Sequence, residues 1–143
     1  MQKKNQKGFS LIELLIVVAI IGIIAAIAIP NLIASRRAAN ESAAIGSMRT
    51  LGTAQATYLS TVGGNTTYAA DLKTLGTSGL IDNVLQTGTK SGYTFTMTGT
   101  ASTYTANADP ATGGGTRHFF TDESGVIRSN ATAAASVSSP AIQ

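Results

Sequence analysis

The chain has 143 residues, which suits one modest domain, and it contains no cysteine, which excludes disulfides, thiolate metal sites and cysteine nucleophiles. Its formal charge is +3, and this excess comes entirely from Lys3, Lys4 and Lys7, because the other basic and acidic residues balance at seven each. The charge therefore does not indicate a nucleic-acid-binding protein; it marks a basic N-terminus.

The first predicted elements are a polar leader and an apolar helix. Residues 1–8 (MQKKNQKG) form the basic leader, and residues 9–29 are almost wholly apolar. A helix of this length spans about 32 Å, against about 30 Å of bilayer hydrocarbon, so we expect one membrane crossing. The lysines predict that the N-terminus stays in the cytoplasm.

A second helical part, over residues 31–62, follows Pro30. This proline has no N–H for the carbonyl of Ala26, so a kink or a loosened turn is expected there, and we take 9–30 and 31–62 as two segments of one helix. The second segment is amphipathic, and "VGGN" at 62–65 is expected to end it. Its predicted buried stripe is Ile45, Met48, Leu51, Ala54 or Gln55, Tyr58 and Val62.

Residues 63–128 predict a small globular domain with an antiparallel sheet. "GYTFTMTG" alternates apolar and polar residues with period two, and "STYTANA", "RHFFTD" and "GVIRS" are further strand candidates. The glycine-broken connection at 68–92 should be held to the core by apolar side chains. These are Leu72, Leu75, Leu80, Ile81, Val84 and Leu85. The fold class is therefore α+β, with a long N-terminal helix packed on three or four strands.

The last segment, residues 129–143, is an Ala/Ser-rich tail of low complexity. Without a cysteine to close a disulfide loop, it must be held by strand pairing or be left loose. The sequence does not decide between these two arrangements.

Glu13 is the one charged side chain of the apolar segment. In hydrocarbon it would cost about 2.5–3.5 kcal/mol, unless it snorkels to the nearby interface or finds a partner. A cut between Gly8 and Phe9 would create an α-ammonium four residues before Glu13, and a neighbouring copy could supply that group as a counter-charge.

The stretch "KGFSLIELLIVVAIIGIIAAIAIPN" resembles the N-terminal signature of type IV pilins and of the pseudopilins of type II secretion. The resemblance covers about 25 residues and includes Gly8, Phe9, Glu13, the apolar run and Pro30. It implies that a prepilin peptidase removes residues 1–8 and N-methylates Phe9, and that Glu13 meets the N-terminus of an adjacent subunit. It also implies local melting of the helix near Gly22 and Pro30.

The same resemblance implies a function and a location. The expected protein is a structural subunit, held in the inner membrane with its N-terminus cytoplasmic. It would then be polymerised into a surface pilus by an assembly platform and an ATPase. Independently, Ala19, Gly22 and Ala26 recur at spacings of three and four, which lets helices approach closely, and the exposed apolar helix needs burial against copies. A contact of this kind that repeats without closing gives a helical filament.

Three alternatives stay open. The first is a pseudopilin that forms a short periplasmic piston, although "DPATGGG" stands where major pseudopilins carry a "DPWG"-like loop. The second is an ordinary secretory signal cut after Ala26-Ile27-Ala28, which would leave Pro30 second in the mature chain. The third is a signal-anchored periplasmic enzyme.

Enzymatic and ligand-binding readings have little support in the sequence. Its single histidine, His118, is expected to face solvent from a strand, and no nucleophile or phosphate-loop motif is present. Asp109, Asp122 and Glu123 are candidate calcium ligands, but the last two are adjacent and are better interpreted as turn carboxylates. We predict no catalytic residue, no metal and no cofactor. Arg36 and Arg37 are interpreted as solvated or lipid-headgroup charges, and DNA binding is unsupported.

Overall fold

The computed structural model describes residues 8–142, so the predictions that rest on Lys3, Lys4, Lys7 and most of the leader lie outside the described residues. The chain divides into two compact units, one up to Ser35 and one from Arg36 onward. The long helix α1 (Leu11–Ser60) belongs to both, and its buried side chains, which begin at Glu41, pack in the second unit. The α+β class predicted from the sequence is confirmed.

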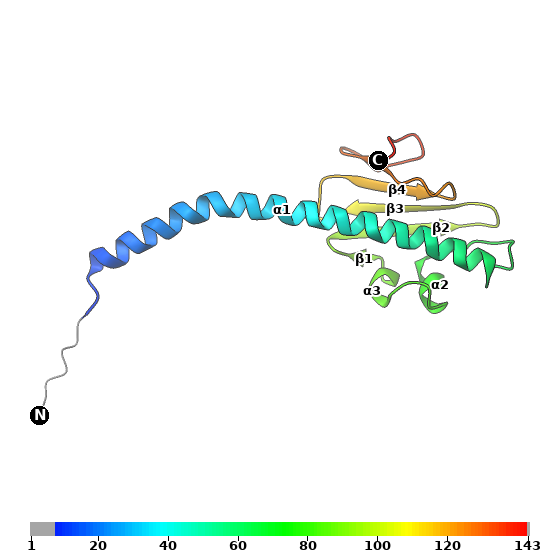
Figure 1. Ribbon diagram of the computed structural model, residues 1–143, viewed down its shortest axis with the longest axis horizontal. Coiled ribbons are helices and arrows are strands. Elements are labelled where there is room, and N and C mark those ends of the chain that lie inside the picture. The colour runs from blue at the N-terminus through cyan, green and yellow to red at the C-terminus, as the bar shows by residue number, and fades with distance from the viewer. Residues whose placement is uncertain (1–7, 143) are drawn as a thin grey trace, which may run out of the picture. The chain divides into compact units, whose positions relative to one another are not determined.

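The globular unit is a five-stranded antiparallel meander with α1 across one face (Figure 1). Neighbours in the sheet are neighbours in sequence, in the order β1-β2-β3-β4-β5. The strands are β1 (Thr89–Lys90), β2 (Tyr93–Gly99), β3 (Tyr104–Pro110), β4 (His118–Asp122) and β5 (Arg128–Asn130). Three or four strands were expected; the additional one is β1, whose two residues are too few to give a periodic signal.

The core lies between α1 and the sheet. In β2 the predicted alternation holds: Tyr93, Phe95 and Met97 are buried, and the threonines between them are exposed. From α1, Met48 and Leu51 reach this core. Val62 does not, because α1 ends at Ser60 and leaves the side chain of Val62 63% exposed, so this part of the predicted stripe was wrong.

The connection between α1 and the sheet contains two short helices, α2 (Leu72–Thr77) and α3 (Asn83–Gln86). Each begins at an aspartate that caps it: Asp71 accepts from the Thr74 N–H and Asp82 from the Leu85 N–H, both at 2.7 Å. The predicted apolar contacts hold for Leu72, Leu75, Ile81 and Leu85, which are buried, and Leu80 packs against them while partly exposed. Val84 was predicted wrongly, since it lies on the outer side of α3 and is 55% exposed.

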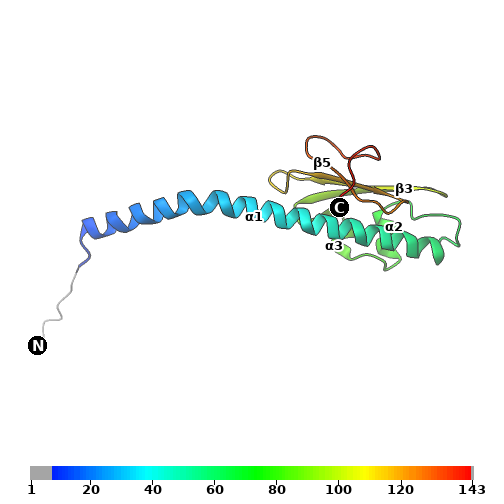
Figure 2. The same ribbon diagram turned by 45° about the horizontal axis from the view of Figure 1, so that its top comes forward.

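The C-terminal tail is tied to β5 rather than left loose, which resolves the choice that the sequence left open. The Ser129 N–H donates to the carbonyl of Pro140, and the Ile142 N–H donates to that of Ile127, at 2.9 and 2.8 Å. A single bridge joins Arg128 to Ala141. In Figure 2 the tail loops back beside β5. It therefore occupies the free edge of β5, which would otherwise expose unpaired backbone groups.

A buried carboxylate joins α1 to the loop between β3 and β4. Glu41 Oε1 accepts from the backbone N–H and the hydroxyl of Thr116, at 2.9 and 2.8 Å, and Oε2 accepts from Arg117 Nε at 2.8 Å. Beside it, Asn40 Nδ2 donates to the carbonyl of Gly114 at 2.8 Å. Gly114 must be a glycine, because a Cβ there would lie 1.9 Å from the carbonyl oxygen of Gly92. The loop "DPATGGG" is thus shaped to fit against the helix.

A second polar anchor lies deeper in the core. The side chain of Gln55 is fully buried; its Nε2 donates to the carbonyl of Ala69 at 3.0 Å and its Oε1 accepts from the Ala69 N–H at 2.9 Å. One amide thereby satisfies both backbone groups of a residue in the loop that follows α1. Since buried backbone groups must be paired, Gln55 fixes where this loop runs.

The stability of the globular unit should depend on the charge of Glu41. Desolvation by burial raises the pKa of Glu41, but the hydrogen bonds from Thr116 and Arg117 outweigh it and lower this pKa from 4.5 to about 2. A depressed pKa stabilises the fold above pH 4.5, and this contribution is lost as the pH falls toward 2. We expect the free energy of unfolding to drop by about 3 kcal/mol across that interval.

Thermal unfolding of the full chain in nonionic detergent, followed by the near-ultraviolet circular dichroism of tyrosine, measures this dependence. Glu41→Gln should lower the midpoint at pH 7 and flatten the dependence between pH 4.5 and 2. The exposed Glu123→Gln is the matched control and should behave as the parent does. An unchanged pH profile in Glu41→Gln would contradict this assignment.

Gln55→Leu should destabilise the globular unit by about 2–4 kcal/mol, because it leaves a buried N–H and a buried carbonyl of Ala69 without partners. Thr53→Ala, two residues earlier and on the exposed side of the helix, should change stability by less than about 0.5 kcal/mol. Urea denaturation of both variants measures the difference. Equal midpoints for the two variants would show that the amide is dispensable.

Candidate functional site

The N-terminal segment begins with three residues that precede the helix. Gly8, Phe9 and Ser10 lie outside α1 and are exposed, and Phe9 retains 84% of its accessible surface. Among residues 8–142, no atom beyond Gly8 itself and its neighbour in the chain lies within 4 Å of the position that a Cβ on Gly8 would take. The predicted cleavage bond between Gly8 and Phe9 is therefore in open, non-helical chain.

Glu13 lies in the first turn of α1 and folds back onto it. Its Oε2 accepts from the Ser10 N–H at 2.8 Å, one of the backbone donors that a helix start leaves unpaired. Ser10 and Glu13 have the Ser-x-x-Glu spacing of a capping box, and in this structure the half in which the glutamate returns to the backbone is formed. This local role of Glu13 was not among the expectations from the sequence, although the Ser-x-x-Glu spacing is a signal for it.

The apolar part of α1 is exposed along its whole length. Within the described residues, α1 is the one helix long and apolar enough to cross a membrane. Its exposed large apolar side chains are Leu11, Ile12, Leu14, Leu15, Ile16, Val17, Val18, Ile20, Ile21, Ile23, Ile24, Ile27, Ile29, Leu32 and Ile33. So continuous an apolar surface is not stable in water and requires lipid or protein around it.

The small residues predicted for helix packing are available for contact. Ala19, Gly22 and Ala26 are all exposed, and a Cβ on Gly22 would meet nothing within 4 Å. Pro30 lies inside α1, and the helix continues through it to Ser60. In this structure, therefore, Pro30 does not end the helix.

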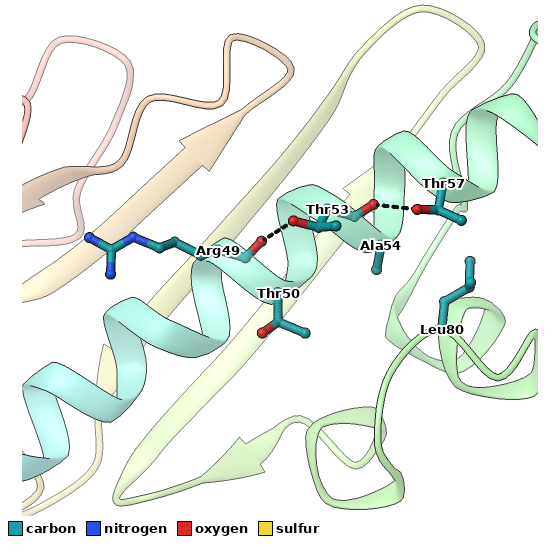
Figure 3. A pocket seen from close by; sticks show the side chains of 6 residues that line it. All are labelled: Arg49, Thr50, Thr53, Ala54, Thr57 and Leu80. Carbon is teal, nitrogen blue, oxygen red and sulfur yellow. Dashed lines mark hydrogen bonds between the residues drawn. The ribbon is translucent and has the colours of Figure 1, made fainter.

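The depressions described here for the globular unit are open and do not gather reactive groups. The one in Figure 3 has a volume of about 310 Å³ and lies between α1 and the chain around Leu80. Its hydroxyls are turned onto their own helix: Thr53 Oγ1 donates to the Arg49 carbonyl at 3.1 Å and Thr57 Oγ1 to the Thr53 carbonyl at 2.9 Å. These groups are thus not directed at a ligand.

The acidic residues weighed as calcium ligands take separate structural roles. Asp109 Oδ1 lies 2.6 Å from Nδ1 of His118, so the histidine is a partly buried pairing residue instead of the solvent-facing one that was expected. Asp122 accepts from the backbone N–H of Ser124 in the turn that follows β4, and Glu123 is exposed. Among the described residues, no group of three potential ligands could hold a metal ion.

Comparison with known proteins concentrates on the N-terminal part of the chain. Residues 3–29 match the prokaryotic N-terminal methylation motif. The chain is 64% identical over 39 residues to the type IV wide pilus major component PilA4 of Thermus thermophilus and 52% identical over 56 residues to the type IV major pilin protein PilA of Myxococcus xanthus. It is 40% identical over 45 residues to the type II secretion system core protein G of Aeromonas hydrophila.

These similarities are partial. They cover 27%, 39% and 32% of this chain and 30%, 26% and 32% of the three relatives, so the chain spans about a third or less of their length. The methylation motif at residues 3–29 holds Gly8, Phe9 and Glu13, and an antiparallel sheet follows it in the chain. In its N-terminal part, the chain is thus similar to type IV pilins and to a type II secretion core protein, and this part begins an α+β architecture.

Proposed function

We propose that the chain is a structural subunit that polymerises through its N-terminal helix into a type IV pilus on the cell surface, with roles such as adhesion, twitching motility or DNA uptake. The observation that carries this proposal is the exposed apolar surface of α1, from Leu11 to Ile33, with a single carboxylate at its start. Such a helix is stable in a bilayer. Outside the bilayer, its apolar surface must be covered by other copies of the chain.

In this proposal the subunit is first processed in the membrane and then assembled into the filament. A prepilin peptidase cuts after Gly8 and N-methylates Phe9 while the segment at 9–30 crosses the inner membrane with its N-terminus in the cytoplasm. An assembly platform and its ATPase then move the subunit into the filament. Exposure of the bond between Gly8 and Phe9 supports access by the peptidase.

In this proposal Glu13 exchanges one partner for another. In the uncut chain it accepts from the Ser10 N–H. In the filament it neutralises the α-ammonium of Phe9 from an adjacent subunit, since a buried charge without a partner is strongly unfavourable. Small side chains at Ala19, Gly22 and Ala26 allow the helices to approach, and Gly22 and Pro30 are the positions where α1 loosens on assembly.

The second candidate function is a pseudopilin that forms a short periplasmic piston for type II secretion, favoured by the similarity to core protein G. The two are separated by electron microscopy of material sheared from cells at native expression. Filaments containing this chain support the pilin, and their absence, with the chain retained in the envelope, supports the pseudopilin. A mature N-terminus beyond Ala28 would contradict both and favour an ordinary secreted protein.

Glu13→Gln should leave membrane insertion intact and lower filament yield at least about tenfold, because an unpaired buried ammonium costs about 3–5 kcal/mol. Quantitative immunoblotting of sheared filaments against the membrane fraction measures both quantities. Ser10→Ala is the matched control, because it keeps the backbone N–H that Glu13 binds. Normal filaments from Glu13→Gln would show that Glu13 only snorkels to the interface.

Ala26→Leu should lower filament yield several-fold, because a larger side chain separates helices that pack through small residues. Ala28→Leu adds the same volume on the opposite side of the helix and should have a smaller effect. The same immunoblot compares the two variants. Equal yields would remove the stripe at Ala19, Gly22 and Ala26 from the proposed packing surface.

A further inference from the structure

Two adjacent arginines follow the apolar segment of α1. Arg36 and Arg37 are exposed, and the last large apolar side chain before them is Ile33. Within residues 8–142, the ion pairs of the structure join other residues: Lys90 with Asp82, Arg117 with Glu41, and His118 with Asp109. Two cationic side chains thus stand together at the end of the apolar surface without a carboxylate partner in the described chain.

Their lack of a partner has a specific structural cause. Glu41 lies four residues after Arg37, a spacing at which oppositely charged side chains on a helix commonly pair. In this structure the carboxylate of Glu41 turns toward the sheet and is occupied by Thr116 and Arg117. The contact that fastens α1 to the globular unit therefore withdraws the one nearby acid from the two arginines.

The position of the arginines along α1 matches the thickness of a membrane. From Leu11, where the helix begins, to Arg36 there are 25 residues, or about 38 Å of helix at about 1.5 Å per residue. A bilayer with its headgroup regions is about 40–45 Å thick. If Leu11 lies in one headgroup layer, Arg36 and Arg37 lie in the opposite headgroup layer.

We propose that Arg36 and Arg37 bind the phosphates of anionic phospholipid headgroups in the leaflet away from the cleavage site, and so set the depth at which the subunit is stored before assembly. The guanidinium group presents a planar set of donors that suits phosphate oxygens, and the long arginine stem lets the charge rise to headgroup level. This inference rests on the membrane stage of the proposed function.

A lipid suits this site better than a nucleic acid or a neighbouring subunit. The arginines continue an apolar surface of membrane length, whereas a nucleic-acid site would need a wider basic surface. In the globular unit the nearest helical cation, Arg49, lies more than three turns further along α1. A neighbour's carboxylate becomes available only after the subunit has left the membrane.

Lipid preference around residue 35 tests the proposal. The chain contains no tryptophan, so Ser35→Trp introduces a single fluorescent reporter beside the two arginines. The full chain is placed in phosphatidylcholine vesicles containing phosphatidylglycerol, and either lipid is brominated to quench the tryptophan. The ratio of quenching gives the preference for the anionic lipid. We expect a preference of about fivefold for each arginine that takes part, and hence up to about 25-fold.

Three variants in the Ser35→Trp background separate the arginines from general charge effects. Arg36→Gln with Arg37→Gln should abolish the preference. Arg36→Lys with Arg37→Lys should retain most of it, because the charge remains. Arg49→Gln removes another exposed arginine of the same helix and should leave it unchanged. No preference in the parent, or the same preference in the double glutamine variant, would overturn the proposal.

Filament yield of the same variants keeps this inference distinct from the proposed function. If the double glutamine variant keeps the full lipid preference but does not polymerise, the arginines act between subunits and the lipid proposal is wrong. If the arginines select anionic lipid but the parent chain forms no filament, the lipid contact holds and the pilin assignment fails.

Discussion

The apolar side chains in the first part of α1 are not covered by the rest of the described chain, and this constrains the polar groups near them. Between Leu11 and Ile33 the described structure offers nothing to shield the large aliphatic side chains of α1, so they require lipid or protein around them. Every polar side chain near them must therefore be stable both in lipid and against protein. Glu13 meets this condition by bonding to the backbone of its own helix start, which provides a partner before any neighbour is present.

The second part of α1 is held in a different way. Apolar burial against the sheet supplies the area, but side chains such as Met48 and Leu51 are tolerant of small shifts. Two polar contacts fix the position of the helix relative to two loops. Glu41 joins the helix to the loop between β3 and β4, and Gln55 joins it to Ala69 in the loop that follows the helix. Both use a long side chain to satisfy backbone groups that burial would otherwise leave unpaired.

The inward turn of Glu41 affects the charge beside the apolar segment. A carboxylate on the helix surface could have neutralised Arg37, but in the core it stabilises the loop and leaves both arginines free for an external anion. One side chain therefore serves the packing of the globular unit and, indirectly, the charge at its boundary with the apolar segment. Because the chain has no cysteine, no disulfide constrains its unfolded state, and the stability of the fold depends more on such contacts.

Features that depend on a local pattern can be predicted from the sequence. The apolar length of residues 9–29 predicts a membrane helix, period-two alternation at 93–98 predicts β2, and the residues around Gly8 and Glu13 carry the family motif. Three contacts become visible in the folded chain: the pairing of Asp109 with His118, the docking of the tail on β5 and the partner of Glu41. These contacts join residues that are distant in the sequence. Long-range polar contacts leave no periodic pattern in the sequence, so the partner of each polar side chain cannot be predicted from its position.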